Sequence, residues 1–114
     1  MEATIKEKSY RFSVRIVKLS RYLQETKREH VMTKQLLRAG TSVGANIAES
    51  QQAQSRPDFI HKLNIALKEA AETNYWLRLL YDTDYMTEKQ FQSIYTDCTE
   101  LERMLTAIIR HTKE

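Results

Sequence analysis

Apolar residues recur three and four positions apart along almost the whole chain, which is the period of an α-helix that buries one face. The longest run has seven positions at alternating intervals of four and three: Phe59, Leu63, Ala66, Ala70, Thr73, Leu77 and Leu80. Similar runs span residues 5–23 and 91–108. Two glycines and one proline in 114 residues are too few for many hairpins. The sequence therefore predicts an all-α fold and excludes an all-β one.

Both glycines, Gly40 and Gly44, fall in a segment where the apolar spacing continues through Leu36, Val43 and Ile47. Because a glycine inside a helix costs about 1 kcal/mol relative to alanine, two of them among small residues predict a continuous helix that approaches a neighbour closely. A loop at this place is the alternative.

Capping residues divide the chain into four helical segments. Ser55 before Pro57 and Asp58 forms a helix start, and Thr87 with Gln90 has the form of a capping box. The boundary around residues 24–33 is less distinct, with Thr33 as a candidate cap. Four amphipathic helices with short connections predict an antiparallel up-down-up-down four-helix bundle, formed by residues 1–114 as a single domain.

Several classes of protein are not expected from the composition. No stretch approaches the roughly 20 apolar residues that span a bilayer, and the N-terminus has no apolar signal core. We therefore expect a cytoplasmic protein without a membrane partner. The single cysteine, Cys98, cannot form an intramolecular disulfide or a CxxC pair, and its place in an apolar stripe predicts burial.

The chain carries no common signature of an enzyme, such as a nucleotide-binding glycine loop or a zinc-binding HExxH. Asp58 and His61 make only half of a bundle-type metal motif, so the sequence predicts no metal, no cofactor and no catalytic residue. Glu69 and Glu72 share a helix side, and paired carboxylates can perform acid and base chemistry. We favour a structural role, with Arg38 and Arg78 offered as ion-pair partners, and we expect a protein that is not an enzyme.

Basic residues are concentrated at one end of the sequence. Residues 1–55 contain ten Lys or Arg against five Asp or Glu, whereas residues 56–114 contain eight against ten. A stripe at spacings of three, four and three comprises Lys8, Arg11, Arg15 and Lys18. Such a stripe can neutralise phosphates of RNA or DNA, and an ordinary solvated helix face is the alternative. Tyr10 and Val14 lie away from the predicted core, which suggests self-association.

Residues 35–49 (QLLRAGTSVGANIAE) resemble the signature of the bacterial four-helix-bundle proteins called 23S rRNA intervening-sequence proteins. The similarity continues through Ser55, Asp58, Phe59, Ile60, Lys62, Leu63, Ala66, Leu67, Glu69, Ala70, Glu72, Thr73, Tyr75, Trp76 and Leu77, and covers nearly the whole chain. The resemblance implies a ring-like homopentamer with no established enzymatic activity. The family is also similar to the accessory protein of diversity-generating retroelements, a basic pentamer that works with a reverse transcriptase and RNA, and this favours nucleic-acid binding.

Six polar residues match signature positions of this family: Arg38, Asn46, Glu49, Glu69, Glu72 and Trp76. They could form a hydrogen-bonded network or a groove for a partner, without a catalytic role. Our leading hypothesis is a non-enzymatic oligomer that binds RNA or a ribonucleoprotein through the basic stripe. The competing hypothesis is a scaffold that binds another protein and no nucleic acid.

Overall fold

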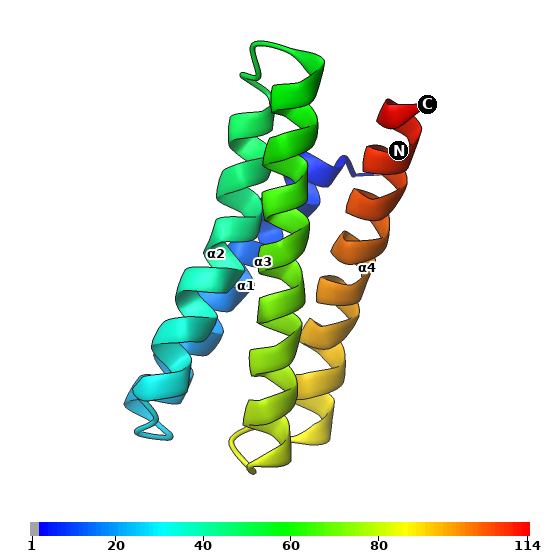
Figure 1. Cartoon of the computed structure of the whole chain (residues 1–114). Coiled ribbons are helices and arrows are strands. Elements are labelled where there is room, and N and C mark those ends of the chain that lie inside the picture. Colours follow the sequence, from blue (N-terminus) through cyan, green and yellow to red (C-terminus); the bar gives the residue numbers. More distant parts are fainter. Residues whose placement is uncertain (1–2) are drawn as a thin grey trace.

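The computed structural model of the protein describes residues 3–114, which form an antiparallel four-helix bundle (Figure 1). The helices are α1 (Ile5–Glu25), α2 (Val31–Ser50), α3 (Arg56–Asp82) and α4 (Glu88–Lys113). Successive helices run in opposite directions, so the two chain ends lie at the same end of the bundle. The predicted all-α class and the up-down-up-down arrangement are confirmed. No helix in the described part is long and apolar enough to cross a membrane.

The helix starts follow the capping chemistry in the sequence. The Ser55 side chain accepts a hydrogen bond from the Asp58 N–H, and Thr87 and Gln90 form the predicted capping box. The cap predicted at Thr33 is wrong, because α2 begins two residues earlier and Thr33 lies inside it. Buried Glu29 caps this helix instead.

The carboxylate of Glu29 accepts hydrogen bonds from the backbone N–H groups of Val31, Met32 and Thr33 and from the Thr33 hydroxyl. Burial by itself raises the pKa of Glu29, but the Thr33 hydroxyl and the three N–H donors outweigh burial and lower that pKa. A negative charge is therefore held at the N-terminus of α2, where the helix dipole favours it.

The predicted core positions fill the centre of the bundle. Most are buried, namely Phe12, Ile16, Leu23, Leu36, Val43, Ile47, Leu63, Ala66, Ala70, Leu77, Leu80, Phe91, Ile94, Cys98, Leu101 and Leu105. Ile5, Leu19 and Phe59 are only partly buried and pack against the core from its edge. Near the end of α4, Ile109 is buried and Ile108 lies at the edge, so the stripe shifts by one residue there.

The two helices α1 and α2 pack closely through the two glycines of α2. The predicted helix across Gly40 and Gly44 is confirmed. A Cβ added at Gly40 would lie 2.7 Å from Cγ2 of Ile16, and one at Gly44 would lie 2.6 Å from Oγ of Ser13. Neither distance leaves room for a Cβ. This close approach explains why α2 has glycine at both positions despite the low helix propensity of glycine.

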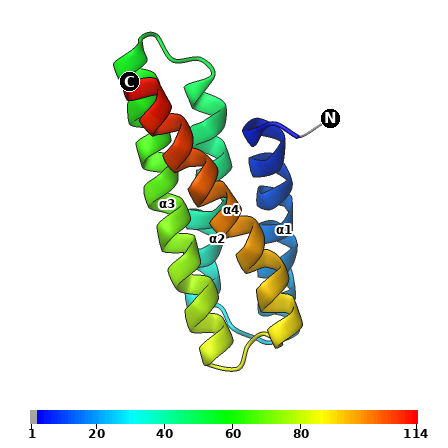
Figure 2. The same cartoon turned by 90° about the vertical axis from the view of Figure 1, so that its right-hand side faces the viewer.

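The pairing of α1 with α4 is looser. Figure 2 shows the N-terminal half of α4 beside α1 and its C-terminal half over α3. These two helices make fewer contacts than any other neighbouring pair in the bundle. The seam between them is therefore open to polar side chains and to solvent, and the basic stripe of α1 lies along it.

Candidate nucleic-acid interface

The basic stripe of α1 is partly neutralised by carboxylates of α4. Lys8 forms an ion pair with Glu100, and Arg15 forms one with Asp97. The Arg15 guanidinium also donates from Nη2 to the Ser93 hydroxyl at 2.8 Å. These contacts hold the two side chains against α4, in partly exposed positions where an ion pair contributes little to stability.

The other two members of the stripe remain exposed. Among residues 3–114, Arg11 and Lys18 form no ion pair. Arg21, on the same helix, is likewise exposed. The surface of α1 thus presents positive charge to solvent even after the two ion pairs with α4 are counted.

Two hollows of different character lie along the α1–α4 seam. The first has a volume of about 200 Å³ and mixes Lys8 and Arg11 with Asp97 and Glu100. The second, of about 460 Å³, is lined by Arg15, Lys18 and Lys89, and no Asp or Glu of residues 3–114 lines it. The positive potential of the seam is therefore strongest at the second hollow.

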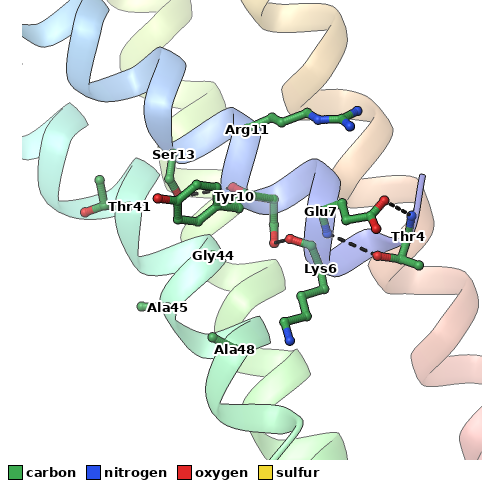
Figure 3. A pocket seen from close by; sticks show the side chains of 11 residues that line it. Thr4, Lys6, Glu7, Tyr10, Arg11, Ser13, Thr41, Gly44, Ala45 and Ala48 are labelled. Carbon is green, nitrogen blue, oxygen red and sulfur yellow. Dashed lines mark hydrogen bonds between the residues drawn. The ribbon is translucent and has the colours of Figure 1, made fainter.

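A groove of about 920 Å³ lies between α1 and α2 (Figure 3). Tyr10, 72% exposed, extends from α1 toward α2 along one side. Gly44, which has no side chain, lines the other side together with the small side chains of Ala45 and Ala48. Val14 and Val17 continue the exposed apolar surface along α1. This face presents apolar surface that a monomer leaves in water.

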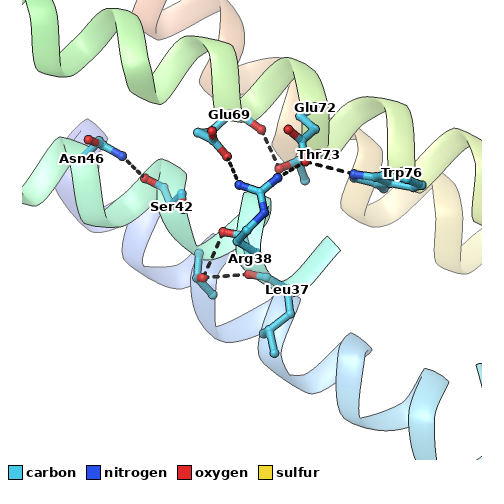
Figure 4. Close-up of polar contacts among 9 residues, drawn as sticks. Leu37, Arg38, Ser42, Asn46, Glu69, Glu72, Thr73 and Trp76 are labelled. Carbon is cyan, nitrogen blue, oxygen red and sulfur yellow. Dashed lines mark hydrogen bonds and ion pairs between the residues drawn. The ribbon is translucent and has the colours of Figure 1, made fainter. Parts of the chain in front are cut away.

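The signature residues of α2 and α3 form a polar network (Figure 4). The Arg38 guanidinium donates from Nη1 to Oε2 of Glu69 at 3.1 Å and forms an ion pair with Glu72. The Trp76 indole N–H donates to the same Glu72 carboxylate at 3.1 Å. The predicted partner Arg38 is confirmed, whereas Arg78 donates to Asn74 instead of a glutamate.

The remaining signature residues lie nearby without joining this network directly. The Asn46 side-chain amide donates to the backbone carbonyl of Ser42 at 2.8 Å. Glu49 pairs with Lys62 across the α2–α3 interface at 3.4 Å. These contacts tie α2 to itself and to α3, and they give both residues a structural role.

The Glu72 carboxylate of the network is held in the charged form. The hydrogen bond from Trp76, together with Arg38, lowers the pKa of Glu72 despite partial burial. The hydrogen bond to Glu72 raises the pKa of Arg38 further above its usual range. A general acid at neutral pH needs a raised carboxyl pKa, and here the shift has the opposite direction.

The other residues considered for metal binding or catalysis are Asp58, His61 and Cys98, and their surroundings in the described chain do not form a reactive site. Asp58 accepts a hydrogen bond from the backbone N–H of Gln54, and His61 is exposed. Within residues 3–114, no three His, Cys, Asp or Glu side chains gather as a metal site would require. Cys98 is buried as expected, and burial, assisted by the Glu102 charge, raises the pKa of its thiol far above the usual range.

Sequence reasoning missed the contribution of α4 to the seam. Lys89 faces the same pocket as Lys18, and Ser93 holds the Arg15 guanidinium. Antiparallel pairing of α1 and α4 brings the end of one helix to the start of the other. The antiparallel order predicted for the bundle indicates that these two helix ends meet, but a stripe on one helix does not show which residues of another helix face it.

Comparison with known proteins finds a family model and a solved structure that are similar to the chain. The family model described as 23S rRNA-intervening sequence protein matches residues 1–107. A crystal structure of a protein of unknown function, from the S23 ribosomal protein family of Bacteroides thetaiotaomicron, is 57% identical. The alignment covers 93% of this chain and 98% of that one, with a TM-score of 0.92. No curated protein matches the chain significantly.

Proposed function

Because the chain belongs to the 23S rRNA-intervening sequence protein family, we propose that it is an oligomeric, non-enzymatic protein that binds RNA through the basic face of α1. The observation that carries this proposal is the charge of that helix. It contains six Lys or Arg and two Glu, and the exposed Arg11, Lys18 and Arg21 are not paired with carboxylates within residues 3–114.

Contacts of this kind supply affinity without reading a base sequence. Lysine and arginine side chains that neutralise phosphates release counterions, so the affinity falls steeply as salt is raised. For a single strand, the logarithm of the affinity falls with the logarithm of salt by about 0.7 per neutralised phosphate. The face of α1 therefore suits the backbone of RNA, whatever its sequence.

A non-catalytic role is supported by the state of the polar groups. Glu69 and Glu72 are both bound by Arg38, and the pKa of Glu72 is lowered. The Cys98 thiol is buried, so it is not placed to attack a substrate. The groups that would perform chemistry are engaged in packing and ion pairs.

The test uses two variants with the same loss of charge. R11Q/K18Q removes the two exposed cations of the stripe, and K68Q/K113Q removes two lysines from α3 and α4. We expect R11Q/K18Q to bind structured RNA more weakly and to lower the salt slope by about 1 to 2, whereas the control binds like the wild type. Fluorescence anisotropy with RNA and with duplex DNA over about 50–200 mM salt measures both quantities.

Equal weakening by both variants would mean that only net charge matters, and the assigned face would be wrong. Wild-type protein that binds neither RNA nor DNA at low salt would reject nucleic-acid binding and favour the protein scaffold. Circular dichroism on both variants checks that the bundle is intact.

Self-association is the second part of the proposal, and the groove between α1 and α2 is the surface we assign to it. A second copy would cover Tyr10 and fill the space above Ala45 and Ala48, which removes exposed apolar surface from water. The resemblance to the family suggests five copies. We expect light scattering to give an oligomer for the wild type and a monomer for Y10D/A45R. An oligomer that survives both changes would place the contact elsewhere.

A further inference from the structure

The larger hollow of the α1–α4 seam has features of a ligand site rather than of an ordinary surface. Its volume of about 460 Å³ falls within the range of small-molecule pockets, about 300–1,000 Å³. Arg15, Lys18 and Lys89 supply three cations, and Asp97 neutralises one of them from outside the lining. The net charge around the hollow is therefore positive and favours an anionic ligand.

The position of Lys89 is not explained by helix stability. Lys89 is the second residue of α4, after Glu88, and Thr87 caps this helix. A positive charge in the first turn opposes the helix dipole, which favours anions there. Lys18 lines the same hollow from α1 and adds a second ammonium group. An anion in the hollow would be attracted by both positive charges.

Arg15 is held in place before any ligand arrives. Its Nη1 atom binds Asp97 and the Ser93 backbone carbonyl, and its Nη2 atom binds the Ser93 hydroxyl. Two or more N–H donors of the guanidinium remain for a ligand, because the group carries five. A positioned guanidinium loses less entropy when it binds a phosphate than a mobile one does.

The rest of the lining is apolar, aromatic and polar. Leu19 and Tyr22 are partly buried and offer an aliphatic side chain and a ring, whereas Met86 and Ile94 belong to the core and expose little surface. Gln90 and Ser93 add an amide and a hydroxyl group. Inorganic phosphate alone would leave this surface in water. A nucleobase has a flat apolar face that packs on such side chains and edges that accept and donate hydrogen bonds. The hollow thus combines three cationic side chains with an aromatic ring and apolar side chains.

We infer that this hollow binds one phosphorylated nucleotide unit, with the phosphate at Lys18, Lys89 and Arg15 and the base against Tyr22 and Leu19. The inference rests on the proposed RNA-binding function in that a nucleotide within an RNA is one source of the ligand, and a free nucleotide is the other. The site lies at the end of the stripe where α4 adds a cation instead of a carboxylate.

The test compares two single changes that separate the hollow from the stripe. K89Q alters the hollow and leaves the stripe of α1 intact, whereas R11Q alters the stripe at a residue that does not line the hollow. The probes are adenosine 5′-monophosphate, adenosine, inorganic phosphate and hexa-adenylate RNA. Amide chemical shifts of the full-length protein report where each probe binds and how tightly.

We expect the nucleotide to shift amides of residues 15–22 and 86–94. Loss of one charged contact in K89Q should weaken its binding about tenfold or more, and R11Q should change it by less than about twofold. Adenosine and inorganic phosphate should each bind more weakly than the nucleotide. If only hexa-adenylate shifts these amides, the inference holds with RNA as the source.

The inference is overturned if neither the nucleotide nor hexa-adenylate shifts those amides, or if K89Q binds both as the wild type does. Its failure can be distinguished from failure of the proposed function. RNA affinity that R11Q lowers and K89Q leaves unchanged rejects the nucleotide site alone. Nucleotide binding that K89Q abolishes, in a protein with no affinity for structured RNA, rejects the proposed RNA-binding function alone.

Discussion

The two sides of α1 join their neighbours in opposite ways. Toward α2, the helix meets two glycines so closely that a Cβ at Gly40 would lie 2.7 Å from Ile16. Toward α4, it is joined by long side chains, Lys8 to Glu100 and Arg15 to Asp97, with hollows between them. At its two glycines the first interface leaves no room for a further side chain, although a groove lined by Tyr10 and Ala48 opens along it. The second interface is bridged by long charged side chains.

This difference separates the close glycine contacts, which hold the fold, from the seam that we propose binds RNA. Close packing against glycine gives many van der Waals contacts and no room for substitution. Partly exposed ion pairs contribute little free energy, so the α1–α4 seam can change its charges at small cost. Charged residues of the seam can therefore serve binding, because the stability of the fold depends little on them.

The largest effect should follow from filling the close α1–α2 contact. In G40V the added side chain must displace Ile16 within a packed core, and overpacking of this kind costs about 1–3 kcal/mol. We expect the free energy of unfolding in urea to fall by about 2–3 kcal/mol. The control A71V adds two methyl groups at an exposed position of α3 and should change stability by less than about 0.5 kcal/mol. Equal effects of the two substitutions would contradict the close contact.

Removal of the carboxylate that starts α2 should have the next largest effect. E29A leaves three N–H groups of the first turn without their acceptor, and loss of such a cap costs about 1–2 kcal/mol. The lowered pKa of Glu29 fixes the sign of the pH dependence. Its stabilisation is fully present above the ordinary glutamate pKa and is lost as pH falls through the lowered folded-state pKa.

Urea unfolding of the wild type and E29A at several pH values measures the free energy of unfolding of each protein. The difference between these two free energies should be constant near neutral pH and should become smaller in acid. A difference that stays the same down to pH 3, about one unit below the ordinary glutamate pKa, would show that the charge of Glu29 does not act as described.

Neutralising the α4 carboxylates tests the loose seam directly. D97N/E100Q frees Arg15 and Lys8 from their ion pairs and should lower stability by no more than about 1 kcal/mol. The same change should increase RNA affinity and steepen its salt slope by up to about 1.4, since two more cations become available. Calorimetry and anisotropy measure the two effects. A large loss of stability without any gain in affinity would contradict the comparison.

The smallest effect on stability is expected at the interface between α2 and α3. R38Q removes the partner that helps to lower the pKa of Glu72, so that pKa should rise while stability changes by about 1 kcal/mol or less. Trp76 is the one tryptophan of the chain and donates to Glu72, so its fluorescence reports protonation of that carboxylate. The acid midpoint of the fluorescence change should move to higher pH in R38Q. An unchanged midpoint would show that Arg38 does not act on Glu72.

The sequence predicts the parts of this molecule that depend on periodicity and local capping. Core positions such as Phe12 and Leu77 follow from helical spacing, and Ser55 and Thr87 act within their own turns. The cap of α2 was misplaced because Glu29 reaches four residues forward with its longer side chain, which a Ser or Thr pattern does not reveal.

The binding surface was predictable only on one helix. Spacing showed that Lys8, Arg11, Arg15 and Lys18 share a side of α1, and the structure confirms that placement. Which of them meet a carboxylate depends on the register of α1 against α4, two helices separated by most of the chain. Register is decided by tertiary packing. No local sequence pattern therefore shows that Lys8 and Arg15 are paired with carboxylates whereas Arg11 and Lys18, among the described residues, are not.

The central claim is that the loose α1–α4 side binds RNA and the close α1–α2 side does not. Ultraviolet cross-linking of the wild-type protein to uridine-containing RNA, followed by mass spectrometry of the peptides, tests it most directly. The account predicts cross-links in residues 11–22 of α1 and 86–94 of α4, and their loss at high salt. Cross-links confined to α2 and α3, or cross-links that high salt does not reduce, would contradict it.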